Sequence, residues 1–252
     1  MYIFCASPGR SGTRFFAEMF KHFTDIPSFH EPLPKCVNEV CAEMNCVDEI
    51  VPSETQDILN IKIQRIKKAA KNGWYFESNH MFIKSFFKTI IWPFEEMGCI
   101  YINRPITDYL MSYSQRGKRH KWPLDFQLDP TWEQNELQMK PSDYSFYEIL
   151  AWNWFEAKAR YLKAQYMFKK TYEFDFRKIN DIGEWQKLFA HFEVPLKRKV
   201  DKIPDDLYRH QSGYTEEMIP SILKHIRDNW KTPGVPQLFP TDMEQLASEA
   251  KK

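Results

Sequence analysis

Residues 6–13 form a short loop in which flexible and polar residues stand side by side. It reads Ala6-Ser7-Pro8-Gly9-Arg10-Ser11-Gly12-Thr13 and lies between an apolar run and a stretch of helical periodicity. A loop that leads into a helix directs backbone N–H groups and the positive helix end at one point, and glycine lets the backbone approach a ligand closely. The residue types favour an anion cradle, most naturally for phosphate. A tight connection without a ligand is the alternative.

This loop differs from the Walker A motif, which requires Gly-Lys followed by Ser or Thr. Here Gly12 is followed by Thr13 and Arg14, so the lysine is absent and no magnesium ligand is specified. A nucleoside-triphosphate kinase is therefore disfavoured. A transferred group that carries less charge than a γ-phosphate, such as sulfuryl, needs no metal, and we expect no metal site.

The elements that must position this loop follow from the alternation of short apolar runs with helical stretches, which is typical of a parallel sheet flanked by helices. We expect one α/β domain over residues 1–252, with a central parallel sheet. The pattern lapses over residues 117–141, which we interpret as a lid over the acceptor. The expected strands are 2–6, 26–30, 74–77, 99–103 and 172–176, and the expected helices are 12–23, 54–71, 83–97 with a bend or break at Pro93, 105–114, 142–167, 182–192 and 216–230.

Composition limits the classes of protein. The chain has 252 residues, and 35 Lys and Arg against 34 Asp and Glu give a net charge of +1, which does not support general nucleic-acid binding. No apolar run is long enough to span a membrane, and no secretory signal is visible. The five cysteines form no C-x-x-C pair, so buried thiols are expected rather than a zinc site. We therefore expect a cytoplasmic protein without a membrane or nucleic-acid partner.

Two motifs together resemble the sulfotransferase family, whose members transfer a sulfuryl group from 3′-phosphoadenosine 5′-phosphosulfate (PAPS). Arg10-Ser11-Gly12-Thr13 is similar to the family's 5′-phosphosulfate loop, and residues 101–113 are similar to its second signature, in which a strand ends in Arg104 and Ser112 follows eight residues later. Residues 172–176 and 188–192 resemble the family's late strand and helix. The resemblance covers most of residues 1–195 and implies a P-loop-containing nucleotide hydrolase-like architecture.

The resemblance also implies where the donor binds, in residues 5–14 and 99–113. The donor-binding residues that it implies are Pro8, Gly9, Arg10, Ser11, Gly12, Thr13, Arg14, Phe15, Arg104 and Ser112. A residue at a strand end and one two turns into the next helix can both reach a phosphate at the carboxyl edge of a sheet. Without a ligand, Arg104 would be a surface salt-bridge residue and Ser112 a solvent-facing one.

The chain departs from the family pattern at two places. Arg14 stands where members often have Thr, and the Arg-Lys-Gly element that closes over the 3′-phosphate in cytosolic members is absent. Residues 208–210 (Tyr-Arg-His) or the basic run 197–199 (Lys-Arg-Lys) could replace it.

Sulfuryl transfer needs a base for the acceptor and cations for the leaving phosphate. Arg10 is the catalytic cation that the resemblance implies. His80 follows the third expected strand, where cytosolic members carry a catalytic His, and Glu31 follows the second, where many carbohydrate-type members carry a catalytic Glu. We prefer His80 slightly over Glu31 as the base, because imidazole titrates near neutral pH. We expect whichever of the two is not the base to orient the acceptor. Ser78 stands where the cytosolic pattern has Lys, so Lys84 is a candidate second cation.

We therefore expect a sulfotransferase that transfers directly and in line from PAPS to a hydroxyl or amine, leaving 3′,5′-adenosine bisphosphate. The acceptor would be a small molecule or a carbohydrate, including natural products, and the protein a monomer or homodimer. Basic residues 116–121 could bind an acidic acceptor or help to hold the 3′-phosphate of the donor, or they could form a solvated loop. Trp152 and Trp154 are expected in the core. The alternatives are a phosphotransferase (kinase) that uses the same loop and a nucleotide-binding protein without catalysis.

Overall fold

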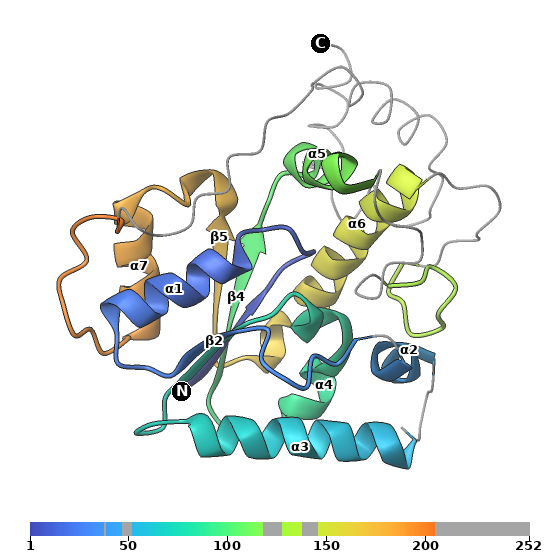
Figure 1. Ribbon diagram of the computed structural model, residues 1–252, viewed down its shortest axis with the longest axis horizontal. Coiled ribbons are helices and arrows are strands. Elements are labelled where there is room, and N and C mark those ends of the chain that lie inside the picture. The colour runs from blue at the N-terminus through green and yellow to red at the C-terminus, as the bar shows by residue number, and fades with distance from the viewer. Residues whose placement is uncertain (38, 47–51, 118–127, 138–145, 205–252) are drawn as a thin grey trace, which may run out of the picture.

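A parallel five-stranded sheet is the centre of the fold (Figure 1). The computed structural model describes residues 1–37, 39–46, 52–117, 128–137 and 146–204. All strand pairings are parallel, and the strand order is β2-β3-β1-β4-β5. The central parallel sheet predicted from the sequence is thus confirmed. Its strands are β1 (Tyr2–Ala6), β2 (Ser28–His30), β3 (Tyr75–Ser78), β4 (Met97–Asn103) and β5 (Lys170–Asp175).

Helices connect these strands and cover both faces of the sheet. The α-helices are α1 (Thr13–Phe23), α2 (Glu39–Cys46), α3 (Ser53–Ala69), α4 (Phe87–Ile90), α5 (Ile106–Gly117), α6 (Phe146–Ala164) and α7 (Ile182–Phe192). Three shorter turns are the π-helical η1 (Phe82–Phe86) and the 3₁₀ turns η2 (Gln165–Met167) and η3 (Phe176–Lys178). Within the described ranges, no helix is long and apolar enough to cross a membrane.

The two faces of β1 belong to two different apolar clusters. Ile3 and Cys5 pack with α1 and α7, whereas Phe4 and Ala6 pack with residues of α3, η1 and α6. In Figure 1, α1 and α7 accordingly lie on one side of the sheet and α6 on the other. Because side chains alternate along a strand, β1 can be buried on both faces only if nearly every residue in it is apolar. This explains the unbroken apolar run at residues 2–6.

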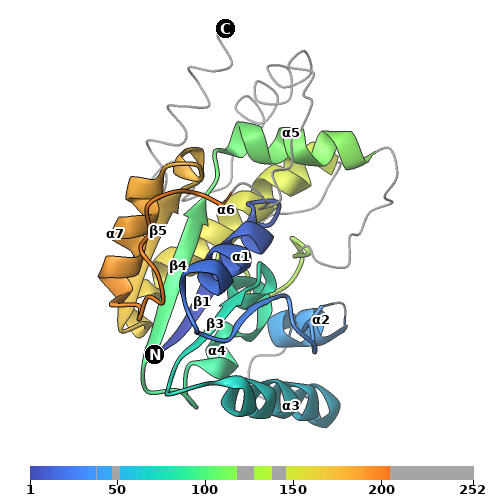
Figure 2. The same ribbon diagram turned by 60° about the vertical axis from the view of Figure 1, so that its left-hand side comes forward.

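The carboxyl ends of all five strands lie at one edge of the sheet, because every pairing is parallel. β1 lies between β3 and β4, so the loop after Ala6 is flanked by the residues that follow Ser78 and Asn103. Figure 2 shows the arrow of β4 pointing toward the edge on which α5 lies. The topology therefore brings the loop after β1 together with the segments that follow β2, β3 and β4.

Several elements differ from the sequence prediction. The helix predicted over residues 83–97 is replaced by η1 and α4, which ends before Pro93, and β4 begins at Met97, two residues before the predicted start. A proline cannot continue a helix without loss of a hydrogen bond. Helix α2 was not predicted. The predicted helix 216–230 lies outside the described residues, as do parts of segments 117–141 and 142–167.

Two predictions about side chains are confirmed. Trp152 and Trp154 are buried in the core rather than in a pocket, with 0% and 1% exposure. The four cysteines whose side chains the structure describes are free thiols and are buried (Cys5, Cys36, Cys41 and Cys99).

Candidate active site

The loop between β1 and α1 has a backbone conformation that suits a ligand cradle. Gly9, Arg10 and Gly12 have φ angles of 104°, 52° and 68°, and Gly12 is the N-cap of α1. The N–H groups of Phe15 and Phe16 donate to the Gly12 carbonyl, so the helical hydrogen bonds begin there and the amides before them have no acceptor within the helix. The first turn contains no acidic residue and the cap has no side-chain hydrogen bond. The positive end of α1 is thus available to an anion.

Two serines brace this loop from within. Ser7 Oγ accepts a hydrogen bond from the Gly9 N–H at 3.1 Å, and Ser11 Oγ donates to the Gly9 carbonyl at 2.8 Å. Both serines are fully buried. The hydroxyl groups therefore hold the shape of the loop, and backbone N–H groups are the natural donors to a bound anion.

The two motifs that the sequence analysis singled out meet directly. Arg104 Nη1 donates to the Arg10 carbonyl, and Arg10 Nε donates to Ser112 Oγ at 3.0 Å. Arg104 and Ser112 are only 6% and 5% exposed, so Arg104 is not a surface salt-bridge residue and Ser112 does not face solvent. The predicted juxtaposition of the motifs near residues 10 and 104 is confirmed.

Arg104 is held on two further sides. Its guanidinium lies over the ring of Phe176, 4.5 Å from the centroid, and its carbonyl accepts a hydrogen bond from Trp154 Nε1 at 2.8 Å. Such stacking orients a planar guanidinium. The sequence analysis did not identify Phe176 as part of the site, although its place directly after β5 puts it at the same sheet edge.

His80 and Glu31 form a hydrogen-bonded pair, called the dyad below. The distance from His80 Nδ1 to Glu31 Oε1 is 2.7 Å, and the two side chains are 14% and 24% exposed. They meet because β2 and β3 are neighbours and each residue follows the end of its strand. In a neutral ring, Nδ1–H donates to the carboxylate, which leaves the basic lone pair on Nε2.

The surroundings of the dyad favour this charge state at neutral pH. Burial lowers the pKa of His80, opposed by the Glu31 hydrogen bond and reinforced by the charge of Lys84. Burial alone would raise the pKa of Glu31, but the hydrogen bond from His80 and the charges of His80 and His30 lower it to about 2. The pair is thus a neutral imidazole held by a carboxylate.

The dyad lies against the loop. A Cβ atom at Gly9 would be 3.6 Å from His80 Cδ2 and 3.2 Å from the Tyr113 hydroxyl. The His80 ring and Tyr113 therefore pack on the backbone of Gly9, and the dyad and the loop after β1 lie side by side. Tyr113 was also missed, although it directly follows Ser112 in the second motif.

A buried ion pair lies behind the dyad. Lys62 Nζ is 2.7 Å from Glu77 Oε1, and both side chains are almost fully buried, with 1% and 0% exposure. Lys62 Nζ also donates to the Pro32 carbonyl at 3.1 Å, and Asn79 Nδ2 donates to Glu77 Oε1 at 2.9 Å. Since Pro32 follows Glu31 and Asn79 precedes His80, this ion pair connects the chain segments that carry the two halves of the dyad.

The other residues that were predicted to bind the sulfuryl donor lie in different surroundings. The Pro8 carbonyl accepts a hydrogen bond from Lys84 Nζ at 2.8 Å, and Thr13 is buried while Arg14 is exposed. The Phe15 ring packs in the core, 5.8 Å from that of Trp185. Its contacts support a packing role rather than a contact with the donor.

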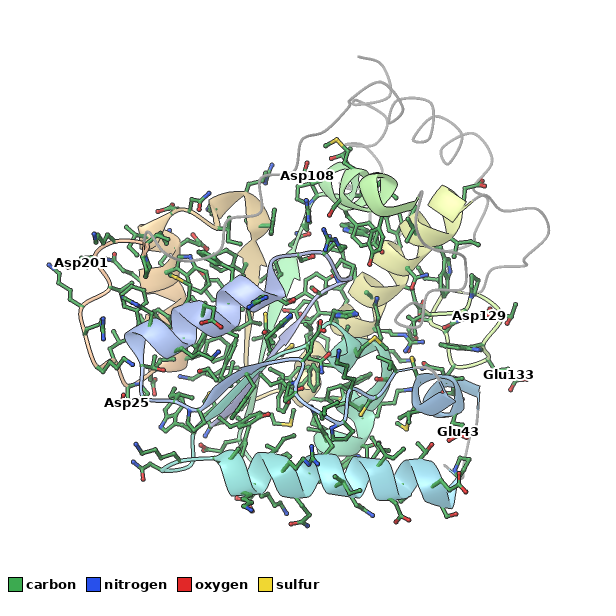
Figure 3. The ribbon with its side chains drawn as sticks, viewed as in Figure 1. Asp25, Glu43, Asp108, Asp129, Glu133 and Asp201 are labelled. Carbon is green, nitrogen blue, oxygen red and sulfur yellow. The ribbon has the colours of Figure 1, made fainter. Side chains whose placement is uncertain are left out.

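The basic run 197–199 does not lie near the loop, so that candidate for the 3′-phosphate is wrong. Lys197 donates to the carbonyls of Lys21 and Phe23, at the C-terminal end of α1. With 11 residues, at about 1.5 Å each, α1 holds this end about 16 Å from the loop. In Figure 3, Asp25 and Asp201 likewise lie on the side where α1 ends, away from Asp108 in the first turn of α5. The alternative run 208–210 and most of the basic segment 116–121 lie outside the described residues.

Comparison with known proteins identifies the fold. No family model matches the sequence, and no curated protein matches it. The crystal structure of a sulfotransferase from Alicyclobacillus acidocaldarius is similar, with a TM-score of 0.52 and 11% sequence identity over 99% of this chain and 95% of that chain. The chain therefore has an α/β sulfotransferase-like fold.

Proposed function

We propose that this protein is a sulfotransferase that moves a sulfuryl group from PAPS to a hydroxyl or amine of a small-molecule or carbohydrate acceptor. The observation that carries the proposal is the meeting of three parts at one sheet edge: the anion loop, the Arg10–Arg104–Ser112 contacts and the dyad against Gly9. A phosphate cradle beside a neutral imidazole suits transfer of a group from a phosphate ester to a nucleophile that must lose a proton.

The residues present fit such a donor. The loop has the positive φ angles of a backbone cradle at Gly9, Arg10 and Gly12, and Gly12 caps α1 without a side-chain hydrogen bond. Backbone amides at the start of α1 would bind the 5′-phosphate, with Arg10 and Arg104 as the cations that stabilise the negative charge of the leaving phosphate. The sulfuryl group comes from the bound donor, so the chain has to supply only orientation, positive charge and a base.

In the proposed step, His80 Nε2 takes the proton of the acceptor hydroxyl or amine as that atom forms a bond to sulfur. The bond from sulfur to the phosphate oxygen breaks in line, and adenosine 3′,5′-bisphosphate leaves with the electron pair. Glu31, hydrogen-bonded to Nδ1 at 2.7 Å, stabilises the imidazolium that forms and holds the ring in the required tautomer. His80 is thus the proposed base, and Glu31 acts through it.

The wider proposal keeps the sequence-based expectations that the structure leaves untested. The protein would act as one domain in the cytoplasm, as a monomer or homodimer, without a metal, a membrane or a nucleic-acid partner. The acceptor would bind beneath the segment 117–141.

A ligand-binding assay tests the donor. Adenosine 3′,5′-bisphosphate at 100 times its Kd should stabilise the protein by about 2.7 kcal/mol in thermal unfolding, with ATP and Mg²⁺ at the same concentration as the comparison. Stronger stabilisation by ATP with Mg²⁺ would instead indicate a phosphotransferase. Incubation with PAPS and an acceptor library, read by mass spectrometry for added SO₃, then tests transfer. Binding of the bisphosphate with no sulfated product across the library would indicate a nucleotide-binding protein without catalysis.

A further inference from the structure

Lys84 is a fully buried lysine directly beneath the loop. Its side chain has 0% exposure, and Nζ donates to the Pro8 carbonyl at 2.8 Å. Pro8 precedes Gly9, on whose backbone the His80 ring packs. Lys84 itself lies in η1, the π-helical turn that begins two residues after His80. The side chain thus joins the loop after β1 to the segment after β3.

The backbone of Lys84 is held as firmly as its side chain. Its carbonyl accepts hydrogen bonds from Arg160 Nη1 at 2.6 Å and from Asn45 Nδ2 at 3.1 Å. Arg160 is in turn fixed by an ion pair with Glu156 at 2.6 Å. Helices α2 and α6 therefore set the position from which Lys84 reaches the loop. A π-helical turn of this kind recurs at functional sites.

A buried ammonium group is costly unless negative charge or dipoles compensate it. Burial lowers the pKa of Lys84 to about 7, with Arg160 reinforcing the shift and Cys41 and Glu31 opposing it. The charge of Lys84 also lowers the pKa of His80. Lys84 therefore interacts electrostatically with both members of the dyad.

We propose that Lys84 is a positioning residue that couples the anion loop to the base. It holds the Pro8 carbonyl from behind the loop, and its buried charge favours the unprotonated form of His80. It affects binding of the donor by holding the loop, without contacting the donor itself. The identity of the anion rests on the proposed function, but the link between Lys84, the loop and His80 does not.

This arrangement makes anion binding dependent on the charge of Lys84. A bound phosphate favours the ammonium form, so binding raises the pKa of Lys84 and takes up protons. Affinity is then highest below pH 7 and falls as the pH rises past the free-state pKa of about 7. If binding raises that pKa by one unit, affinity falls roughly sixfold between pH 6.5 and 8.5.

Calorimetry with adenosine 3′,5′-bisphosphate, from pH 6.5 to 8.5, measures this coupling. Lys84→Met removes the charge and the hydrogen bond, whereas Lys84→Gln keeps a donor for the Pro8 carbonyl. Lys88→Met is the matched control, because Lys88 lies four residues further along the same segment and is exposed. Titration of the phosphate groups themselves is common to all four proteins, so the differences between them isolate Lys84.

We expect the wild type and Lys88→Met to share the fall in affinity above pH 7, and both Lys84 variants to lack it. We also expect NMR titration to give a higher His80 pKa in both Lys84 variants. The same pH dependence in the Lys84 variants as in the wild type, or an unchanged His80 pKa, would overturn the inference. If the wild type does not bind the bisphosphate at all, the proposed donor is wrong, and the His80 titration alone decides whether Lys84 acts on the base.

Discussion

The proposed function gives different roles to His80 and Glu31, whose side chains share a hydrogen bond, and substitution distinguishes these roles. His80→Asn removes the basic nitrogen and places an amide near the position of Nδ1, so a donor to Glu31 is retained. Glu31→Gln keeps an acceptor for His80 but removes the negative charge. If His80 is the base and Glu31 acts through it, the first variant should lose far more activity than the second.

The expected sizes follow from the contacts. A general base contributes about 10²- to 10⁴-fold in rate, which corresponds to about 2.7 to 5.4 kcal/mol of barrier. A hydrogen bond to a charged group contributes about 1.5 to 3 kcal/mol, and solvent screening reduces that value for a partly exposed carboxylate. Glu31 is 24% exposed. We therefore expect kcat to fall at least about 100-fold in His80→Asn and about tenfold in Glu31→Gln.

The double variant and the pH profile test separately whether Glu31 acts through His80. Because Glu31 acts only through His80, the double variant should be no slower than His80→Asn alone. The pKa of His80 is lowered in the folded protein, so with saturating donor the activity should be flat at neutral pH and fall on the acid side, as His80 becomes protonated. Glu31 raises the pKa of His80, so loss of its charge should move the acid limb of kcat/KM to lower pH.

Initial rates of sulfuryl transfer, measured from pH 4.5 to 9 with saturating donor, provide the assay, and bisphosphate affinity is the control for an intact donor site. A larger loss in Glu31→Gln than in His80→Asn would refute the reasoning and make Glu31 the base. Additive losses in the double variant would show that the two residues act independently.

Three further substitutions test residues that hold the loop, the dyad and the second motif in place. Gly12→Ala places a Cβ 2.9 Å from Ile179 Cδ1 at a φ of 68°, so the free energy of unfolding should fall by at least about 1–2 kcal/mol in chemical denaturation. Lys62→Met leaves the buried Glu77 without its ion-pair partner and should cost about 3–5 kcal/mol by the same measurement, with a smaller cost when Glu77→Gln is added. Arg104→Lys loses the planar guanidinium that stacks on Phe176 and should weaken bisphosphate binding about tenfold in calorimetry.

Much of the site could be predicted because its residues stand next to strand ends, and the strands are recognisable locally. The run at residues 2–6 must be buried on both faces, so it predicts both a central strand and the direction of the loop that follows. A parallel sheet then brings the residues after every strand to one edge. Arg10 and Arg104 could therefore be expected together although 94 positions separate them.

Which side chains contact one another at that edge could not be predicted, because these contacts depend on the order of the strands in the sheet and on the winding of single turns. The sequence offered His80 and Glu31 as separate candidates, and only the neighbouring positions of β2 and β3 make them a dyad. The helix expected from residue 83 depended on apolar spacing, which cannot distinguish α from π winding. Yet the side chain of Lys84 reaches Pro8 from that π-helical turn.

If His80 is the base, as proposed, these connections imply that the free protein already holds it in the geometry needed for the reaction. The halves of the dyad follow different strands, and the Glu31 N–H donates to the Ser78 carbonyl at 3.1 Å, which joins the two segments through the backbone as well. The Lys62–Glu77 ion pair joins the same two segments from behind. A base positioned in this way loses little conformational freedom when the acceptor arrives. Weakening the ion pair should therefore lower kcat more than bisphosphate affinity, since the anion loop is braced separately by Ser7 and Ser11.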